Sequence, residues 1–113
     1  TRARVLVLGL AFKEECPDIR NSKVVDLISE LREYQCEVDV FDPWIRPDDA
    51  SKYYNLTLLD FVNAEIYDAI IIAVAHSCFL DLWQRQIVTE KSESCVVFDL
   101  KCILPRLHSD FRL

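Results

Sequence analysis

The sequence predicts an α/β domain of three layers, in which a parallel β-sheet carries helices on both faces. Short, continuous apolar segments, typical of strands buried on both faces, alternate along the chain with segments of helical periodicity. The length of 113 residues leaves room for one hydrophobic core and no second domain. A composition that is 51% hydrophobic and 28% charged is ordinary for a packed globular fold.

The first third of the chain has the pattern of a β-loop-α-β unit. Residues 4–8 (RVLVL) form a β-branched apolar run that predicts a buried strand. Apolar residues at helical spacing predict a helix over residues 23–34, with Asn21 or Ser22 as its N-cap. Residues 37–41 (EVDVF) predict a second strand, which ends at Asp-Pro because proline cannot extend the hydrogen-bond ladder.

The rest of the chain continues the alternation. Residues 56–63 are expected to form a short helix, and residues 68–75 (DAIIIAVA) the most apolar strand. Residues 80–88 have weak helical character, and residues 95–100 (CVVFDL) predict the last strand. This order indicates a Rossmann-like fold with a parallel sheet.

Charge and cysteine content exclude several classes of protein. The formal net charge of -6, without runs of like charge, gives neither nucleic acid nor an anionic membrane a broad surface to bind. The apolar run 69–75 is far too short to cross a bilayer. The five cysteines are odd in number and never in C-x-x-C spacing, which favours reduced thiols, a cytoplasmic location and no metal site.

The start of the sequence bears on domain organisation. The chain has no methionine and begins with Thr1-Arg2, almost directly on the first strand pattern. We therefore expect residues 1–113 to be a single domain excised from a longer protein.

Ligands of open parallel sheets bind beyond the carboxyl ends of the strands. The residues expected at that edge are 9–21, Asp42, His76 and Lys101. Gly9 is the only glycine in the chain, which excludes both the G-x-G-x-x-G dinucleotide fingerprint and a Walker A loop. A ligand at this edge must therefore be held by side chains and ordinary backbone.

Three cations are expected to converge on this crevice: Lys13, Arg20 and Lys101. Such a group suits a phosphate or a carboxylate. The alternative is that they are solvated surface charges, balanced in the loop by nearby acidic residues. His76 could bond a ligand, but a polar residue that ends a buried strand is more often structural, and Asp42 before proline favours a turn.

Three stretches resemble the C-terminal domain of the UDP-glucose/GDP-mannose dehydrogenase family. They are residues 9–22 (GLAFKEECPDIRNS), 40–43 (VFDP) and 98–101 (FDLK), which agree with the family in order and spacing over nearly the whole chain. The CPDIRNS version of the loop is most similar to bacterial enzymes that oxidise UDP-N-acetylhexosamines for surface polysaccharides of the Vi-antigen and O-antigen type.

The resemblance implies an activity that this chain serves only in part. The family oxidises the C6 hydroxyl of a nucleotide sugar to a carboxylate with two NAD, through a thioester on a cysteine. That cysteine lies in a glycine-rich motif upstream, so a chain with Gly9 alone holds no catalytic residue. The expected partners are an N-terminal Rossmann domain that binds NAD and a central helical segment, in a homo-oligomeric enzyme.

The resemblance also implies roles for individual residues. Phe12 and Lys13 match positions that contact substrate, Lys101 matches a basic residue that contacts the UDP-sugar, and Arg20 matches an arginine that reaches NAD across the domain interface. Cys102 departs from the family pattern, where glycine is common, and could alter the loop that carries Lys101.

Two other classes stay as alternatives. One is a stand-alone nucleotide-binding or scaffold domain, which would bind its ligand tightly without an upstream half. The other is a flavodoxin-like signalling module, which would need an acidic pair after the first strand, where Gly9 and Leu10 stand.

Overall fold

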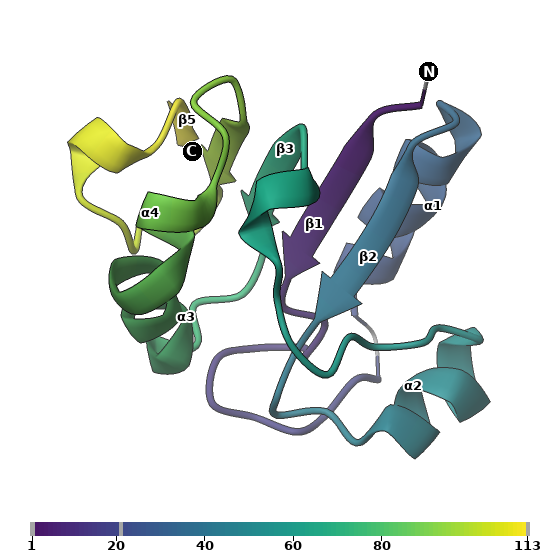
Figure 1. The fold of residues 1–113 in the computed structure, drawn as a ribbon. Helices are drawn as coiled ribbons and strands as arrows, with labels where there is room; N and C mark the ends of the chain where they lie inside the picture. The colour runs from purple at the N-terminus through teal and green to yellow at the C-terminus, as the bar shows by residue number, and fades with distance from the viewer. Residues whose placement is uncertain (1, 21, 113) are drawn as a thin grey trace.

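The computed structural model describes residues 2–20 and 22–112 of the chain. In this part of the chain, five strands form one parallel sheet in the order β2-β1-β3-β4-β5 (Figure 1). The strands are β1 (Arg4–Leu8), β2 (Glu37–Phe41), β3 (Ala69–Ile72), β4 (Val96–Asp99) and β5 (Phe111–Arg112). The predicted parallel α/β sheet is confirmed.

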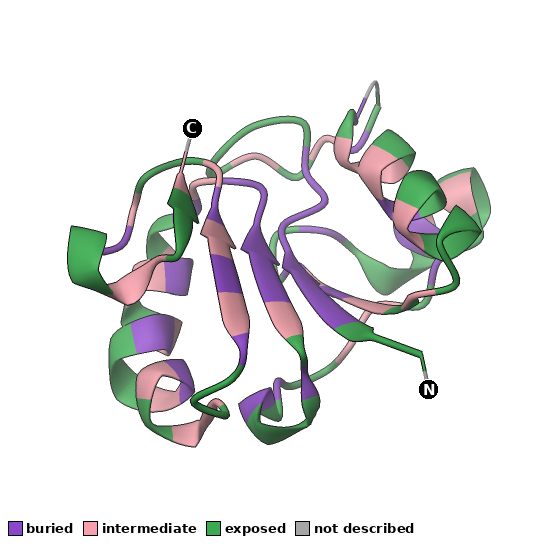
Figure 2. Ribbon diagram, turned by 90° about the horizontal axis from the view of Figure 1, so that it is seen from above, coloured by how far each residue is buried: buried purple, intermediate pink, exposed green. Residues whose placement is uncertain are grey.

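Helices pack on both faces of the sheet, because alternate strand residues point to opposite sides. On one face Ile28 of α1 (Val24–Glu33) packs with Val5 and Val7. On the other face, Phe79 and Trp83 pack with the strand residues that point to that side. Phe79 belongs to α3 (Ser77–Leu82), and Trp83 begins the π-helical turn Trp83–Ile87, which leads into α4 (Val88–Glu90). Figure 2 shows buried residues concentrated along the central strands, while the helices expose their outer sides.

Most predicted elements are present, with shifted ends. The strands at 4–8 and 37–41 have the predicted bounds, whereas β3 and β4 are shorter than residues 68–75 and 95–100. The helix predicted at 80–88 begins earlier, at Ser77, and continues to Glu90. Apolar residues therefore extend past the ends of β3 and β4.

The short helix predicted at residues 56–63 is wrong. Leu58 forms an isolated parallel bridge with Val40, so this segment runs beside the edge strand β2. The helix of this region is α2 (Pro47–Tyr54), which starts on a proline at its first position and ends at Asn55 with a φ of 55°. Proline at a helix start and asparagine in the left-handed conformation at its end are ordinary helix boundaries, and they were the missed signals.

The predicted N-cap of the first helix is also wrong for Ser22. The residue before α1 is Lys23, which makes no side-chain capping bond, and the Ser22 hydroxyl instead donates a 2.7 Å hydrogen bond to the carbonyl of Leu10. Asn21, the other predicted cap, lies outside the described residues. Ser22 thus fastens the end of the loop after β1 to its beginning.

The sequence did not reveal β5, so the strand predicted as the last one is followed by another. β5 has two residues, and Phe111 stacks on Phe98 of β4 with ring centroids 4.8 Å apart. Two residues are too few to show a strand periodicity.

The helices found in the described residues are not long and apolar enough to span a membrane.

Candidate functional site

The loop that follows β1 begins with a glycine that no other residue can replace without strain. Gly9 has a φ of 108°, and a Cβ built on it would lie 2.6 Å from the Cβ of Val74. The chain leaving β3 therefore passes directly over the chain leaving β1. Glycine is required here by both its backbone conformation and this close approach.

Asp42, at the end of β2, binds the same loop. Its Oδ2 accepts hydrogen bonds from the amides of Leu10 at 2.8 Å and Ala11 at 2.9 Å, and its Oδ1 accepts one from the amide of Trp44 at 2.9 Å. The bond to Trp44 confirms the predicted turn. Burial acts to raise the pKa of Asp42, but hydrogen bonds from His76 and these three amides outweigh it and hold the pKa below its ordinary value.

His76 is fully buried and links Asp42 to the far end of the loop. Its Nδ1 lies 2.9 Å from the amide nitrogen of Glu15, which can only donate, so Nδ1 is the acceptor and the ring proton sits on Nε2. Nε2 then donates to Oδ2 of Asp42 at 3.1 Å. The rings of Trp44 and Phe79 flank the imidazole, with centroid distances of 5.8 and 5.2 Å. The structural interpretation of His76 is confirmed.

Glu15 ties the loop to the helix that follows β3. It adopts a φ of 55°, and its Oε1 accepts a 2.6 Å hydrogen bond from the amide of Ser77, the first residue of α3. The hydrogen bonds from Ser77 lower the pKa of the Glu15 carboxyl. The loop is thus joined to the segments that follow β2 and β3.

A second loop follows β4 and carries Lys101. Asp99 is fully buried, and its two carboxylate oxygens accept hydrogen bonds from the amides of Ile103 at 3.1 Å and Leu104 at 2.8 Å. Its carbonyl accepts the amide of Cys102 at 3.3 Å, where φ is 56°. The tight turn directs Lys101 toward the carboxyl edge of the sheet.

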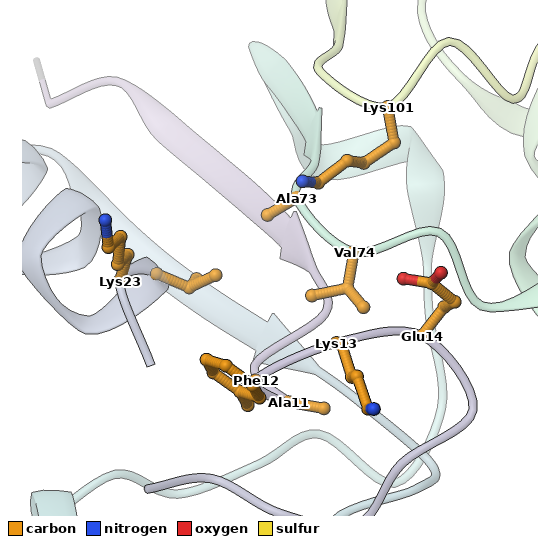
Figure 3. Close-up of a pocket in the computed structure, with 9 residues that line it drawn as sticks. Ala11, Phe12, Lys13, Glu14, Lys23, Ala73, Val74 and Lys101 are labelled. Carbon is orange, nitrogen blue, oxygen red and sulfur yellow. The ribbon is translucent and has the colours of Figure 1, made fainter. Parts of the chain in front are cut away.

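The two loops and the start of α1 enclose a pocket of about 200 Å³. Figure 3 shows that Lys101 extends from the second loop toward the chain segment after β3, while Lys13 comes from the first loop and Lys23 from the start of α1. Phe12, which is 54% exposed, lines the pocket, and Glu14 brings one carboxylate. Small and apolar side chains complete the wall: Ala11, Val24, Ala73 and Val74. Three cations against one anion make this pocket positive in an otherwise acidic chain.

Arg20 is not among the described residues that line this pocket. Its Nε and Nη2 donate to the two carboxylate oxygens of Asp18, each at 3.1 Å, and its side chain is 79% exposed. The guanidinium lowers the pKa of the Asp18 carboxyl. Lys13 and Lys101 therefore line one pocket, whereas Arg20, which was expected to converge with them, is directed outward and balanced by an acid of its own loop.

Sequence reasoning missed Lys23. The periodicity assigned this residue to the helix, where a lysine is an ordinary surface residue. The available signal was its position: the helix that follows the first strand begins at the carboxyl edge of the sheet, so a cation at its N-terminal end lies beside the crevice.

The whole arrangement agrees with a known family. Residues 6–106 match the model of the UDP-glucose/GDP-mannose dehydrogenase family, UDP binding domain. The chain belongs to this family. This match confirms the resemblance that the three motifs showed.

Bacterial nucleotide-sugar dehydrogenases are similar to this chain over nearly its whole length. A UDP-N-acetyl-D-glucosamine 6-dehydrogenase of Pseudomonas aeruginosa is 48% identical over 111 residues, which are 98% of this chain and 26% of that protein. A protein of the same name from Salmonella typhi is 42% identical over 109 residues, 96% of this chain and 26% of that protein. The chain thus spans about a quarter of the length of these relatives.

A solved structure has the same fold. The UDP-D-ManNAc dehydrogenase of Pyrococcus horikoshii superposes with a TM-score of 0.75 at 28% identity, over 98% of this chain and 25% of that one. The Rossmann-like prediction is confirmed by this likeness.

Proposed function

We propose that residues 1–113 are the C-terminal UDP-sugar-binding domain of an NAD-dependent UDP-sugar 6-dehydrogenase. The observation that carries the proposal is the pocket lined by Phe12, Lys13 and Lys101, found in a chain of this family. The names of the relatives favour a UDP-N-acetylhexosamine as the substrate. As in the sequence prediction, the product would serve surface polysaccharide synthesis.

The charges of the pocket suit a nucleoside diphosphate. Lys13, Lys23 and Lys101 come from three separate segments and can surround one small anion, whereas the negative chain as a whole repels extended polyanions. The exposed ring of Phe12 offers an apolar surface for a sugar or a base. The pocket therefore recognises charge and shape together.

In the reaction the residues of this chain orient the substrate. The overall change is oxidation of the C6 alcohol to a carboxylate, in which two NAD would each accept one hydride and one water would supply the second carboxylate oxygen. The lysines would hold the diphosphate so that C6 points out of the pocket, toward the part of the enzyme that holds the reacting cysteine. This chain contributes no catalytic residue.

Arg20 is proposed to contact NAD from across a domain interface. Asp18 fixes the orientation of the guanidinium, which stays largely exposed and suits a phosphate or hydroxyl presented by another domain. The partners are the N-terminal Rossmann domain and central helical segment of the same homo-oligomeric enzyme, in the cytoplasm.

Calorimetric titration of UDP and UDP-N-acetylglucosamine into the 113-residue chain tests the proposal. We expect weak binding of both ligands, reduced about tenfold by Lys13→Ala, by Lys101→Ala and by Lys23→Ala, because each removes a charge-assisted contact. Uridine, which lacks the diphosphate, should bind much more weakly.

Lys91→Ala is the matched control, since Lys91 follows α4 and lines a different groove, beside Glu93. It should leave the affinity for UDP unchanged. Equal losses in all four lysine variants would indicate a general charge effect and contradict the pocket. Tight binding that no lysine variant weakens would instead favour a stand-alone nucleotide-binding domain.

A further inference from the structure

We propose that Asp42 and His76 are positioning residues that form a clamp: together they hold the substrate-binding loop, residues Gly9–Glu15, in place. The inference rests on the proposed function, because it assigns to this pair the task of holding Phe12 and Lys13 in the orientation that binds the nucleotide sugar.

The pair holds the loop at both ends. At the beginning, Oδ2 of Asp42 accepts the amides of Leu10 and Ala11 at 2.8 and 2.9 Å. At the end, Nδ1 of His76 accepts the amide of Glu15 at 2.9 Å. The residues between these anchors are those that line the pocket, Phe12, Lys13 and Glu14, and they are exposed.

All hydrogen-bonding groups of the two side chains also have partners, so the clamp fixes one geometry of the loop. Each carboxylate oxygen of Asp42 and each ring nitrogen of His76 has a hydrogen-bond partner, and the 3.1 Å bond between the two side chains joins them into one unit. A buried polar network in which all groups are paired fixes a single arrangement, because any other leaves an unpaired group away from water.

A local turn does not require this network. The turn at Asp42 needs only the hydrogen bond that its Oδ1 accepts from the amide of Trp44. The other bonds join segments 31 to 61 residues apart, which follow β1, β2 and β3. The clamp therefore sets the relative position of three strand ends, and with it the entrance of the pocket.

Holding the loop before the ligand arrives raises affinity. A free loop must lose conformational entropy when it binds, and that loss is subtracted from the contacts that Lys13 and Phe12 make. Loosening one anchor should thus weaken UDP binding, even though neither Asp42 nor His76 is among the described residues that line the pocket.

Three substitutions of His76 separate the clamp from simple packing. His76→Phe keeps an aromatic ring between Trp44 and Phe79 but removes both hydrogen bonds. His76→Asn can place its side-chain oxygen near the position of Nδ1 and accept the Glu15 amide, whereas His76→Gln can place its amide near Nε2 and donate to Asp42. We expect His76→Phe to weaken UDP binding about tenfold. His76→Asn should bind UDP almost as tightly as the wild type, and His76→Gln should recover less of the loss.

The other histidine supplies the control. Nδ1 of His108 accepts a 2.8 Å hydrogen bond from the indole of Trp83, and His108 does not line the pocket among the described residues. His108→Phe should cost stability and leave UDP binding unchanged. The free energy of unfolding of every variant is then measured in urea and compared with its affinity for UDP. The clamp predicts that affinity depends on whether the Glu15 hydrogen bond is kept. An affinity that instead falls in proportion to the loss of overall stability would overturn the clamp.

Amide hydrogen exchange measures the clamp without a ligand. In His76→Phe the amide of Glu15 should exchange about tenfold faster than the change in global stability predicts, and His76→Asn should restore its protection. Unchanged protection of Glu15 in His76→Phe would overturn the clamp, whether or not UDP binds. Absence of UDP binding by the wild-type chain, with the exchange result as expected, would count against the proposed function alone.

Discussion

The two loops that carry Lys13 and Lys101 lie at the same edge of the sheet, and each is organised by a buried aspartate. Asp99 accepts amides four and five residues further along its own loop. Asp42 accepts amides of a loop 31 and 32 residues earlier and is joined to a buried histidine 34 residues later. One loop is shaped by its own sequence, and the other by neighbouring strands.

Backbone strain differs between the loops in the same way. Gly9 is confined by the chain after β3, so its conformation is imposed by tertiary contact. Cys102 adopts a φ of 56° inside a turn that Asp99 closes locally. The comparison shows that the first loop depends on the assembled sheet, while the second could form as a turn by itself.

The largest expected effect concerns the two aspartates. Asp42→Ala should lower the free energy of unfolding by about 3–5 kcal/mol, because it leaves four donors, among them the buried imidazole, without their acceptor. Asp99→Ala, which leaves two amides without theirs, should cost about 1–3 kcal/mol. Urea denaturation at neutral pH measures both. An Asp99→Ala loss equal to or larger than that of Asp42→Ala would contradict the comparison.

Gly9→Ala should be nearly as harmful. A φ of 108° and a Cβ 2.6 Å from Val74 combine backbone strain with overpacking, for an expected loss of about 2–4 kcal/mol in the free energy of unfolding. The double variant with Val74→Ala should recover only a small part of this loss, because it removes the contact with Cγ2 at 2.7 Å but keeps those with the Cβ and backbone nitrogen of Val74, and the backbone strain remains. Full stability in Gly9→Ala alone would show that the first loop is not confined by the chain after β3.

Acid should act on the first loop through Asp42. Its pKa lies below the ordinary value, so its contribution to stability is complete above about pH 5 and is lost as the pH falls through the lowered pKa. The difference in unfolding free energy between the wild type and Asp42→Asn should thus be constant from pH 7 to about 5 and shrink below about pH 4. A difference that grows on acidification would contradict the lowered pKa.

The smallest effect is expected in the second loop. Cys102→Gly relieves the positive φ but makes the unfolded chain more flexible, so it should stabilise the domain by about 0.5 kcal/mol at most. The midpoint of thermal unfolding detects it, and UDP affinity should be unchanged because Asp99 still closes the turn. Loss of UDP binding in Cys102→Gly would mean that this turn also needs long-range support.

Sequence reasoning located the elements whose signal is local. β1, α1 and β2 follow from apolar periodicity over ten residues or fewer, and Lys13 and Lys101 were expected at the crevice because parallel strands end at one edge. The short helix at 56–63 was mistaken because Leu58 lies beside Val40 of the edge strand, a contact that local sequence does not display.

By itself the sequence determined a parallel α/β sheet, a glycine after the first strand, and cations at the strand ends. These depend on periodicity and on residue types within a few positions. Only the tertiary structure decided that Lys23 joins the pocket, that Arg20 turns outward, and that Asp42 and His76 bind the first loop. For Asp42 and His76 the physical reason is sequence separation: buried polar groups select partners by proximity in the folded chain, and the partners in this loop lie 31 to 61 residues away in sequence.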